Sequence, residues 1–220
     1  MNQKIRSMFH RIGDNQGFTL VEMALVLIII GIIIGAIAKG KDLVRGSEQK
    51  RIYTKFFNEW RLGYLNFYDR TGKILGDTWD GAAIGQDGQA DTSAGTGVAA
   101  TAAGRAAMVT TAVTTYKGVQ NIGLNAPVTN RPTAFEYSYV DSQGTTHIMD
   151  IAFQWDGVNN YNYMLIQNIP VELGLAMDTM VDGKAEGNVG DFLYIDGAGA
   201  AAAWPSTPTT AVTARWKMQF

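Results

Sequence analysis

The sequence contains no cysteine, and its 220 residues include only two histidines, His10 and His147. The first absence excludes disulfides, a thiolate nucleophile and any cysteine-based zinc or iron–sulfur site. The second excludes a histidine-rich metal centre. The net charge of −2 argues against a dedicated nucleic-acid-binding protein. We therefore expect neither a nucleic-acid partner nor a cofactor.

Sequence motifs of enzymes are also missing. No GxSxG, P-loop or dinucleotide-binding glycine pattern occurs. A hydrolase triad would have to use His147, which stands at the start of a predicted strand, where an ordinary cross-strand role is expected. The sequence predicts a protein that is not an enzyme.

Charged residues are nearly absent from residues 18–38, which follow a polar, basic stretch at 1–17. Only Thr19 and Glu22 interrupt the apolar run. As a helix the segment would be about 32 Å long, close to the roughly 30 Å thickness of a bilayer's hydrocarbon core. Because every face of this helix would be apolar, the pattern predicts a membrane-spanning helix, not a core helix of a soluble domain.

Proline is absent from residues 39–70, and the pattern there becomes amphipathic. Aromatic residues recur with helical spacing, which predicts that the helix continues. Phe18 to Tyr68 would then form one helix of about 77 Å. We expect the aromatic stripe to pack on a globular domain and not to hold a cofactor. Its members are Tyr53, Phe56, Phe57, Trp60, Tyr64, Phe67 and Tyr68.

The remaining residues, 71–220, predict a β-rich head. Gly144 suits the turn of a hairpin, and Pro170 suits the start of a short helix at 171–181 that Gly183 would close. The Gly/Ala/Thr-rich segment at about 77–115 predicts an exposed loop. An antiparallel sheet with one face on the aromatic stripe would bury both apolar surfaces. Strands are predicted at 135–140, 147–155, 161–169, 192–196 and 214–220.

Charge is unevenly divided along the chain. Residues 39–61 carry seven Lys/Arg and three Asp/Glu, whereas residues 62–220 carry eight and fifteen. A basic helix next to an acidic head suits self-association, and it is equally consistent with contact between the basic segment and lipid headgroups.

The junction Gly17-Phe18-Thr19-Leu20-Val21-Glu22, followed by the apolar run, resembles the class III signal of type IV pilins and type II secretion pseudopilins. The resemblance covers about residues 10–40, and the amphipathic continuation extends it to Tyr68. It implies that prepilin peptidase cuts after Gly17 and methylates the new terminus at Phe18. It also implies an α+β, type IV pilin-like fold, in which one long N-terminal helix packs on a small antiparallel sheet.

Glu22 is the single carboxylate of the apolar run, and it needs a partner. After cleavage it would lie about 6 Å along the helix axis from the Phe18 amine. The positive end of the helix dipole favours it there, and the amine of a neighbouring copy can pair with it. Gly31 and Gly35 are four residues apart, a spacing that permits close approach between helices. The alternative is that these glycines ease local unwinding when subunits leave the membrane. The resemblance to pilins implies a filament with these helices at its core and the heads outside.

The expected function is therefore a structural subunit of a type IV pilus or pilus-like filament, with a type II secretion pseudopilin or a minor tip pilin as alternatives. Expected partners are further copies and related pilins, prepilin peptidase, inner-membrane assembly machinery and, before assembly, the lipid bilayer. The leader would be cytoplasmic and the helix would cross the inner membrane once. The product would be an extracellular pilus or a periplasmic pseudopilus.

A different class of protein also fits part of the pattern. Met23–Gly35 could form the apolar region of an ordinary signal peptide, with a cleavage site at Ala36-Ile37-Ala38. Cleavage after Ala38 would release an exported soluble protein that begins at Lys39. The terminus of the mature chain separates the two hypotheses.

The sequence departs from the pilin pattern in four places. Lys39 stands where many major pilins have a kink-forming proline, and Leu75 stands where a proline usually precedes Gly-Asp. The cysteine pair of many pilin heads is missing, so the C-terminal loop must be held in another way. Three basic residues precede the span and five fall within the fifteen after it, which opposes the family's topology by the positive-inside rule.

Asp178, Asp182 and Asp191 form a weak calcium candidate. Aligned with an EF-hand loop, Met180 and Val189 would occupy ligand positions three and twelve, where neither can bind calcium. A polar turn at the end of the short helix is the preferred interpretation, and no metal is predicted.

Overall fold

The computed structural model describes residues 17–77, 88–90, 109 and 118–219. The chain forms two compact units, which divide between Gly46 and Ser47. The predicted leader, apart from Gly17, and most of the predicted loop at about 77–115 lie outside the described residues.

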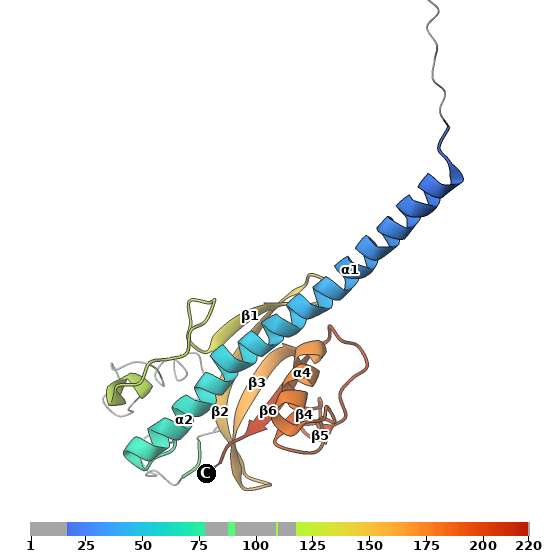
Figure 1. The fold of residues 1–220 in the computed structure, drawn as a ribbon. Coiled ribbons are helices and arrows are strands. Elements are labelled where there is room, and N and C mark those ends of the chain that lie inside the picture. Colours follow the sequence, from blue (N-terminus) through green and yellow to red (C-terminus); the bar gives the residue numbers. More distant parts are fainter. Residues whose placement is uncertain (1–16, 78–87, 91–108, 110–117, 220) are drawn as a thin grey trace, which may run out of the picture. The chain divides into compact units, whose positions relative to one another are not determined.

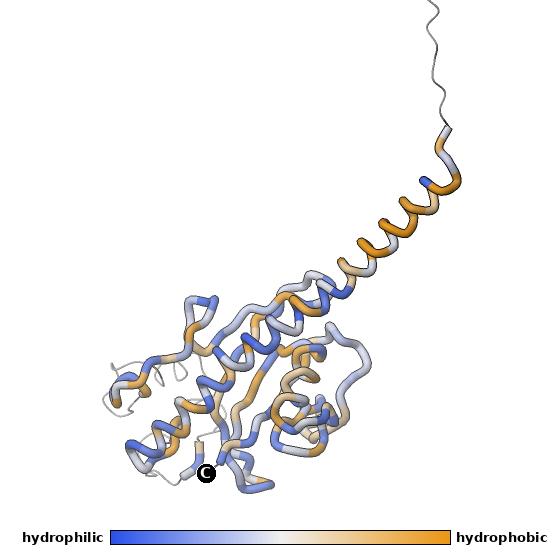
Figure 2. Tube along the Cα trace, in the orientation of Figure 1, coloured by the Kyte–Doolittle hydropathy of each residue, from blue (hydrophilic) through white to orange (hydrophobic). Residues whose placement is uncertain are grey.

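Helix α1 (Leu20–Ile52) begins two residues after Phe18 and continues through Lys39. Most of the first half of α1 is hydrophobic (Figure 2), and Glu22 is the acidic residue of its first turn. By length and composition it can cross a membrane, and its apolar stretch is not buried within the protein. The prediction of a long N-terminal apolar helix is confirmed.

The helical run is not uniform, although its spacing predicts one regular helix from Phe18 to Tyr68. A π-helical turn, η1 (Tyr53–Phe57), separates α1 from α2 (Asn58–Thr71). A π turn holds more residues than an α turn, and here the adjacent Phe56 and Phe57 are both fully buried. Thr54 Oγ1 donates a 2.8 Å hydrogen bond to the Lys50 carbonyl beside this turn. Gly72, with φ at 68°, ends α2.

Six antiparallel strands form one sheet in the order β1-β2-β3-β6-β4-β5 (Figure 1). The predicted antiparallel sheet is confirmed. The strands are β1 (Glu136–Val140), β2 (Thr146–Asp156), β3 (Tyr161–Pro170), β4 (Phe192–Ile195), β5 (Ala201–Ala202) and β6 (Ala211–Lys217).

Two strands differ from the prediction by more than one residue at an end. β6 starts at Ala211 and not at residue 214, because its first residues pair with the end of β3 (Pro170 with Ala211). β5 was not predicted, since two alanines show no alternation of apolar and polar residues. Helix α4 (Val171–Asp182) has Pro170 as its N-cap and ends at Gly183, where φ is 81°.

The aromatic stripe packs on the sheet within the second unit. The Phe56 ring centroid lies 5.1 Å from that of Tyr137, and the Tyr64 centroid lies 5.0 Å from that of Phe153. Trp60 is buried, and its indole N–H donates to the Ala134 carbonyl at 3.1 Å. Because α4 adds Leu173 and Met177 to the same core, this face of the sheet is closed. A short 3-10 helix, η2 (Val119–Ile122), precedes the sheet.

Candidate functional site

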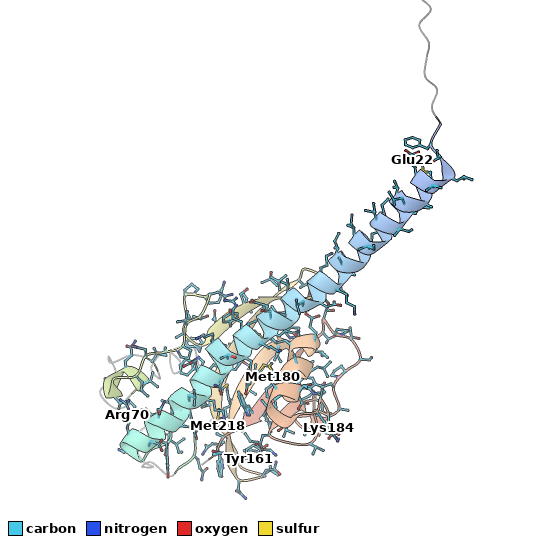
Figure 3. The ribbon with its side chains drawn as sticks, viewed as in Figure 1. Glu22, Arg70, Tyr161, Met180, Lys184 and Met218 are labelled. Atoms are coloured by element: carbon cyan, nitrogen blue, oxygen red, sulfur yellow. The ribbon has the colours of Figure 1, made fainter. Side chains whose placement is uncertain are left out.

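The first turn of α1 holds its carboxylate through a local hydrogen-bond pair. Glu22 Oε2 accepts from the Thr19 backbone N–H and from the Thr19 hydroxyl, both at 3.0 Å. In return the Glu22 backbone N–H donates to Thr19 Oγ1 at 3.2 Å. This reciprocal pair is a capping box, which satisfies backbone donors that a helix start leaves free. Figure 3 shows Glu22 at this end of α1.

The capping box changes the expectation for Glu22. From the sequence, the expected partner of this carboxylate is the amine of another copy, yet Thr19 of its own chain already bonds it. The signal was readable in the sequence, because Thr-x-x-Glu before an apolar run is the capping-box pattern. Both donors of Thr19 reach Oε2, so Oε1 can accept from a further group.

Gly17 and Phe18 precede the helix. Gly17 is exposed, and a Cβ placed on it would have no atom of the described residues within 4 Å. The Phe18 side chain is 78% exposed. Within the part of the chain that the structure describes, nothing therefore covers the position proposed for cleavage.

The rest of the first unit offers a continuous apolar surface. Gly31 and Gly35 lie one turn apart on α1, and a Cβ at either position would meet open space. Apolar side chains surround them on all sides of the helix. The exposed ones include Leu20, Val21, Leu25, Val26, Leu27, Ile28, Ile29, Ile30, Ile32, Ile33, Ile34 and Ile37.

Among the calcium candidates, the two helical carboxylates hold the loop that follows α4. Asp178 Oδ2 accepts from Trp204 Nε1 at 2.6 Å and from the Gly187 backbone N–H at 2.9 Å. Asp182 accepts from the backbone N–H groups of Asp191 and Phe192. Asp191 thus contributes its backbone to this cluster. Within the described residues, no three His, Asp or Glu side chains are grouped to hold a metal.

His147 lies at the start of β2, opposite Tyr139 of β1. Its Nε2 is 2.9 Å from Asp141 Oδ2, and both side chains are buried. The hydrogen bond from His147 is the main cause that lowers the pKa of Asp141, and backbone hydrogen bonds from Gln143 and Thr145 act in the same direction against desolvation. Sequence reasoning missed this pair, which fixes the β1–β2 turn.

Comparison with known proteins identifies one segment. The family model described as "Prokaryotic N-terminal methylation motif" matches residues 13–38, a range that includes Gly17, Phe18, Glu22, Gly31 and Gly35. No curated protein and no solved structure matches the chain.

Proposed function

We propose that this chain, which carries the prepilin-type signal of type IV pilins and pseudopilins, is a structural subunit of a type IV pilus or pilus-like filament. The observation that carries the proposal is the position of the signal. It lies at the start of a helix that is apolar on every side and long enough to cross a membrane.

Processing is the first step of the proposal. Prepilin peptidase cuts after Gly17, and the new amine of Phe18 is methylated. The open surroundings of Gly17 support access of a peptidase to this bond. Leu20, the first helical residue, lies two positions beyond the new terminus, so cleavage leaves α1 intact.

The membrane holds the subunit before assembly. A helix that is apolar on all faces is stable in hydrocarbon or among similar helices. The leader stays in the cytoplasm, the helix spans the inner membrane once, and the head lies on the far side. Assembly machinery in the inner membrane then moves the helix from lipid into a bundle.

Glu22 joins neighbouring copies in the filament. Thr19 holds one carboxylate oxygen, and the other accepts from the Phe18 amine of an adjacent copy. Such a charged pair is strong in an apolar surrounding. Gly31 and Gly35 let a neighbouring helix approach closely. The heads lie outside the helical core.

The proposed organisation has four parts: leader 1–17, filament-core helix 18–38, amphipathic continuation 39–70 and β-rich head 71–220. The same parts would serve an extracellular pilus, a periplasmic type II secretion pseudopilus or a minor pilin at a tip.

Mass spectrometry of the mature terminus tests the proposal. We expect a chain that begins with N-methylated Phe18 when prepilin peptidase is present, and the uncut chain when it is not. Gly17→Ala should block cleavage, and Gly40→Ala is the matched control because both positions have free space for a methyl group. A mature chain that begins at Lys39 would contradict the proposal and support an ordinary signal peptide.

A further inference from the structure

A groove lies on the face of the sheet opposite the aromatic stripe. The cross-strand pair Met164 and Trp216 belongs to the hydrophobic core, and the next pair along these strands is Tyr163 and Lys217. Because successive side chains point to opposite faces of a strand, this second pair faces away from the core. The groove has a volume of about 780 Å³, within the roughly 300–1,000 Å³ typical of ligand sites.

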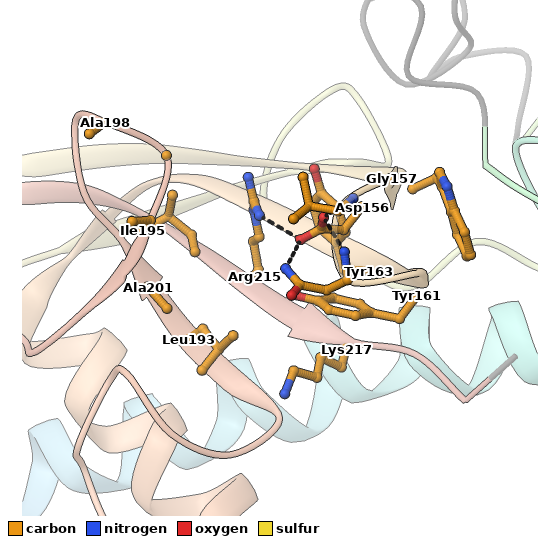
Figure 4. A pocket seen from close by; sticks show the side chains of 15 residues that line it. Asp156, Gly157, Tyr161, Tyr163, Leu193, Ile195, Ala198, Ala201, Arg215 and Lys217 are labelled. Atoms are coloured by element: carbon orange, nitrogen blue, oxygen red, sulfur yellow. Dashed lines mark hydrogen bonds and ion pairs between the residues drawn. The ribbon is translucent and has the colours of Figure 1, made fainter.

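Residues of five strands, β2 to β6, and of two turns line the groove (Figure 4). One side carries Leu193 and Ile195 of β4, and the other carries the tyrosines of β3. Arg215 lies between these sides. The β2–β3 turn at 157–160 and the β4–β5 turn at 196–200 contribute residues to the lining. The groove therefore combines an apolar side with an aromatic and cationic one.

Cations and aromatic rings alternate on the floor. The Arg215 guanidinium carbon is 4.7 Å from the Tyr163 ring centroid, and Lys217 Nζ is 5.5 Å from that of Tyr161. The two tyrosine rings meet edge to face at 6.1 Å. Such contacts hold long side chains in one place. The floor is thus organised before a ligand arrives.

The charge of Arg215 is matched inside the groove. Arg215 Nη1 is 3.1 Å from Asp156 Oδ2, and the side chains are 20% and 7% exposed. Burial alone would raise the pKa of Asp156, but hydrogen bonds from Asn159 and Val158 and the charge of Arg215 hold it below its usual range. Asp156 is therefore ionised at neutral pH and neutralises Arg215.

Lys217 supplies the remaining charge. Its Nζ donates to the carbonyl of Gly190 at 2.6 Å, a neutral acceptor, and no carboxylate among the residues that the structure describes forms an ion pair with it. The described residues of the lining include one carboxylate and two cations, although residues 62–220 carry fifteen Asp/Glu and only eight Lys/Arg. A positive groove in an acidic region favours an anionic ligand.

We propose that this groove binds a carboxylated saccharide, with a hexuronate unit as the recognised group. The uronate carboxylate pairs with Lys217, the C–H face of the sugar ring packs on Tyr161, and the hydroxyls bond polar groups of the rim. The single unbalanced cation matches one charge per sugar ring. A nucleic-acid strand would need cations repeated along its phosphates.

A peptide strand fits less well, because the groove lies over the face of the sheet. The backbone groups of β3, β6 and β4 are paired with one another there. Peptide recognition by strand addition uses a free sheet edge.

Calorimetric titration of the detergent-solubilised full chain with trigalacturonate tests this site. The neutral galactose trimer of the same linkage serves as the reference ligand. We expect Lys217→Gln to weaken trigalacturonate about tenfold or more and to leave the neutral trimer unchanged. Tyr161→Ala should weaken both. Lys184→Gln is the control, because it removes an exposed lysine away from the groove and should change neither (Figure 3).

Two results would overturn the proposal. The first is that trigalacturonate does not bind even at concentrations on the order of 10 mM, well above the dissociation constant of a specific site. The other is tighter binding of a single-stranded oligonucleotide or of polyglutamate than of trigalacturonate, with the same loss in Lys217→Gln. Thermal unfolding of each variant shows that it is folded. The titration does not depend on filament assembly, so its failure leaves the proposed function standing.

Discussion

The indole N–H of Trp204 donates a 2.6 Å hydrogen bond to Asp178 Oδ2, which ties the segment after β5 to helix α4. The Trp204 ring is stacked near Tyr194, with centroids 5.5 Å apart. A Cβ on Gly174 would lie 2.5 Å from this ring. In a chain without cysteine, this contact and the hydrogen bonds that Asp182 accepts from Asp191 and Phe192 hold the C-terminal loop.

Gly174→Ala should destabilise the head. The added methyl group has no room beside Trp204, and overpacking of this kind costs about 1–3 kcal/mol. Gly63→Ala is the matched control, because Gly63 also lies within a helix but has open space at its Cβ position. There alanine should stabilise by about 0.5–1 kcal/mol. Thermal unfolding of the full chain in detergent, followed by tryptophan fluorescence, measures both. If both variants changed the unfolding temperature equally, the Trp204 ring would have to move aside at little cost.

Asp178→Asn should change how stability depends on pH. Burial is the main cause that raises the pKa of Asp178, so the folded state favours its protonated form. The stability from this group is therefore complete below the unfolded pKa of about 3.9, and it is lost as the pH rises through the folded value. Asparagine is neutral throughout. We expect the melting temperature of Asp178→Asn, relative to that of the native chain, to rise as the pH increases from 4 to 7. A constant difference would contradict this.

For Asp141→Asn, stability relative to the native chain should change with pH in the opposite direction. The hydrogen bond from His147 lowers the pKa of Asp141, so its stabilising effect is present above the unfolded pKa and is lost as the pH falls through the folded value. We expect Asp141→Asn to melt below the native chain at pH 7 and the difference to close on acidification.

Asp196 provides the matched control for Asp141. Asp141 Oδ1 accepts from the backbone N–H groups two and four residues later, and Asp196 Oδ1 does the same in the β4–β5 turn. Only Asp141 also has the bond to His147. At pH 7, Asp196→Asn should therefore lower the melting temperature less than Asp141→Asn does. An equal decrease in melting temperature would mean that Asp141 stabilises the head through the hydrogen bonds of the turn and not through His147.

Glu22→Ala should reduce assembled filaments at least tenfold if, as proposed, its carboxylate pairs with the Phe18 amine of a neighbouring copy. Asp42→Ala removes another exposed carboxylate from the same helix and should assemble normally. Thr19→Ser keeps the hydroxyl of the capping box and should assemble better than Thr19→Ala. Electron microscopy and immunoblotting of sheared filaments measure all four. Filaments of Glu22→Ala at native abundance would contradict the proposed role of Glu22.

The sequence alone determined the features that depend on patterns of neighbouring residues. The all-apolar run, the aromatic spacing and the alternating strands predicted the long helix and an antiparallel sheet. The order from Gly17 to Glu22 likewise pointed to the methylation signal. Each depends on residues close in the chain, whose periodicity reflects helix or strand geometry.

Only the tertiary structure decided the features that depend on residues far apart in the sequence. It placed β6 between β3 and β4, and it set Trp204 against Asp178 and Gly174. It also brought Arg215 and Lys217 beside the tyrosines of β3. Strand order and cross-strand neighbours follow from how the whole core closes, and no local periodicity encodes that.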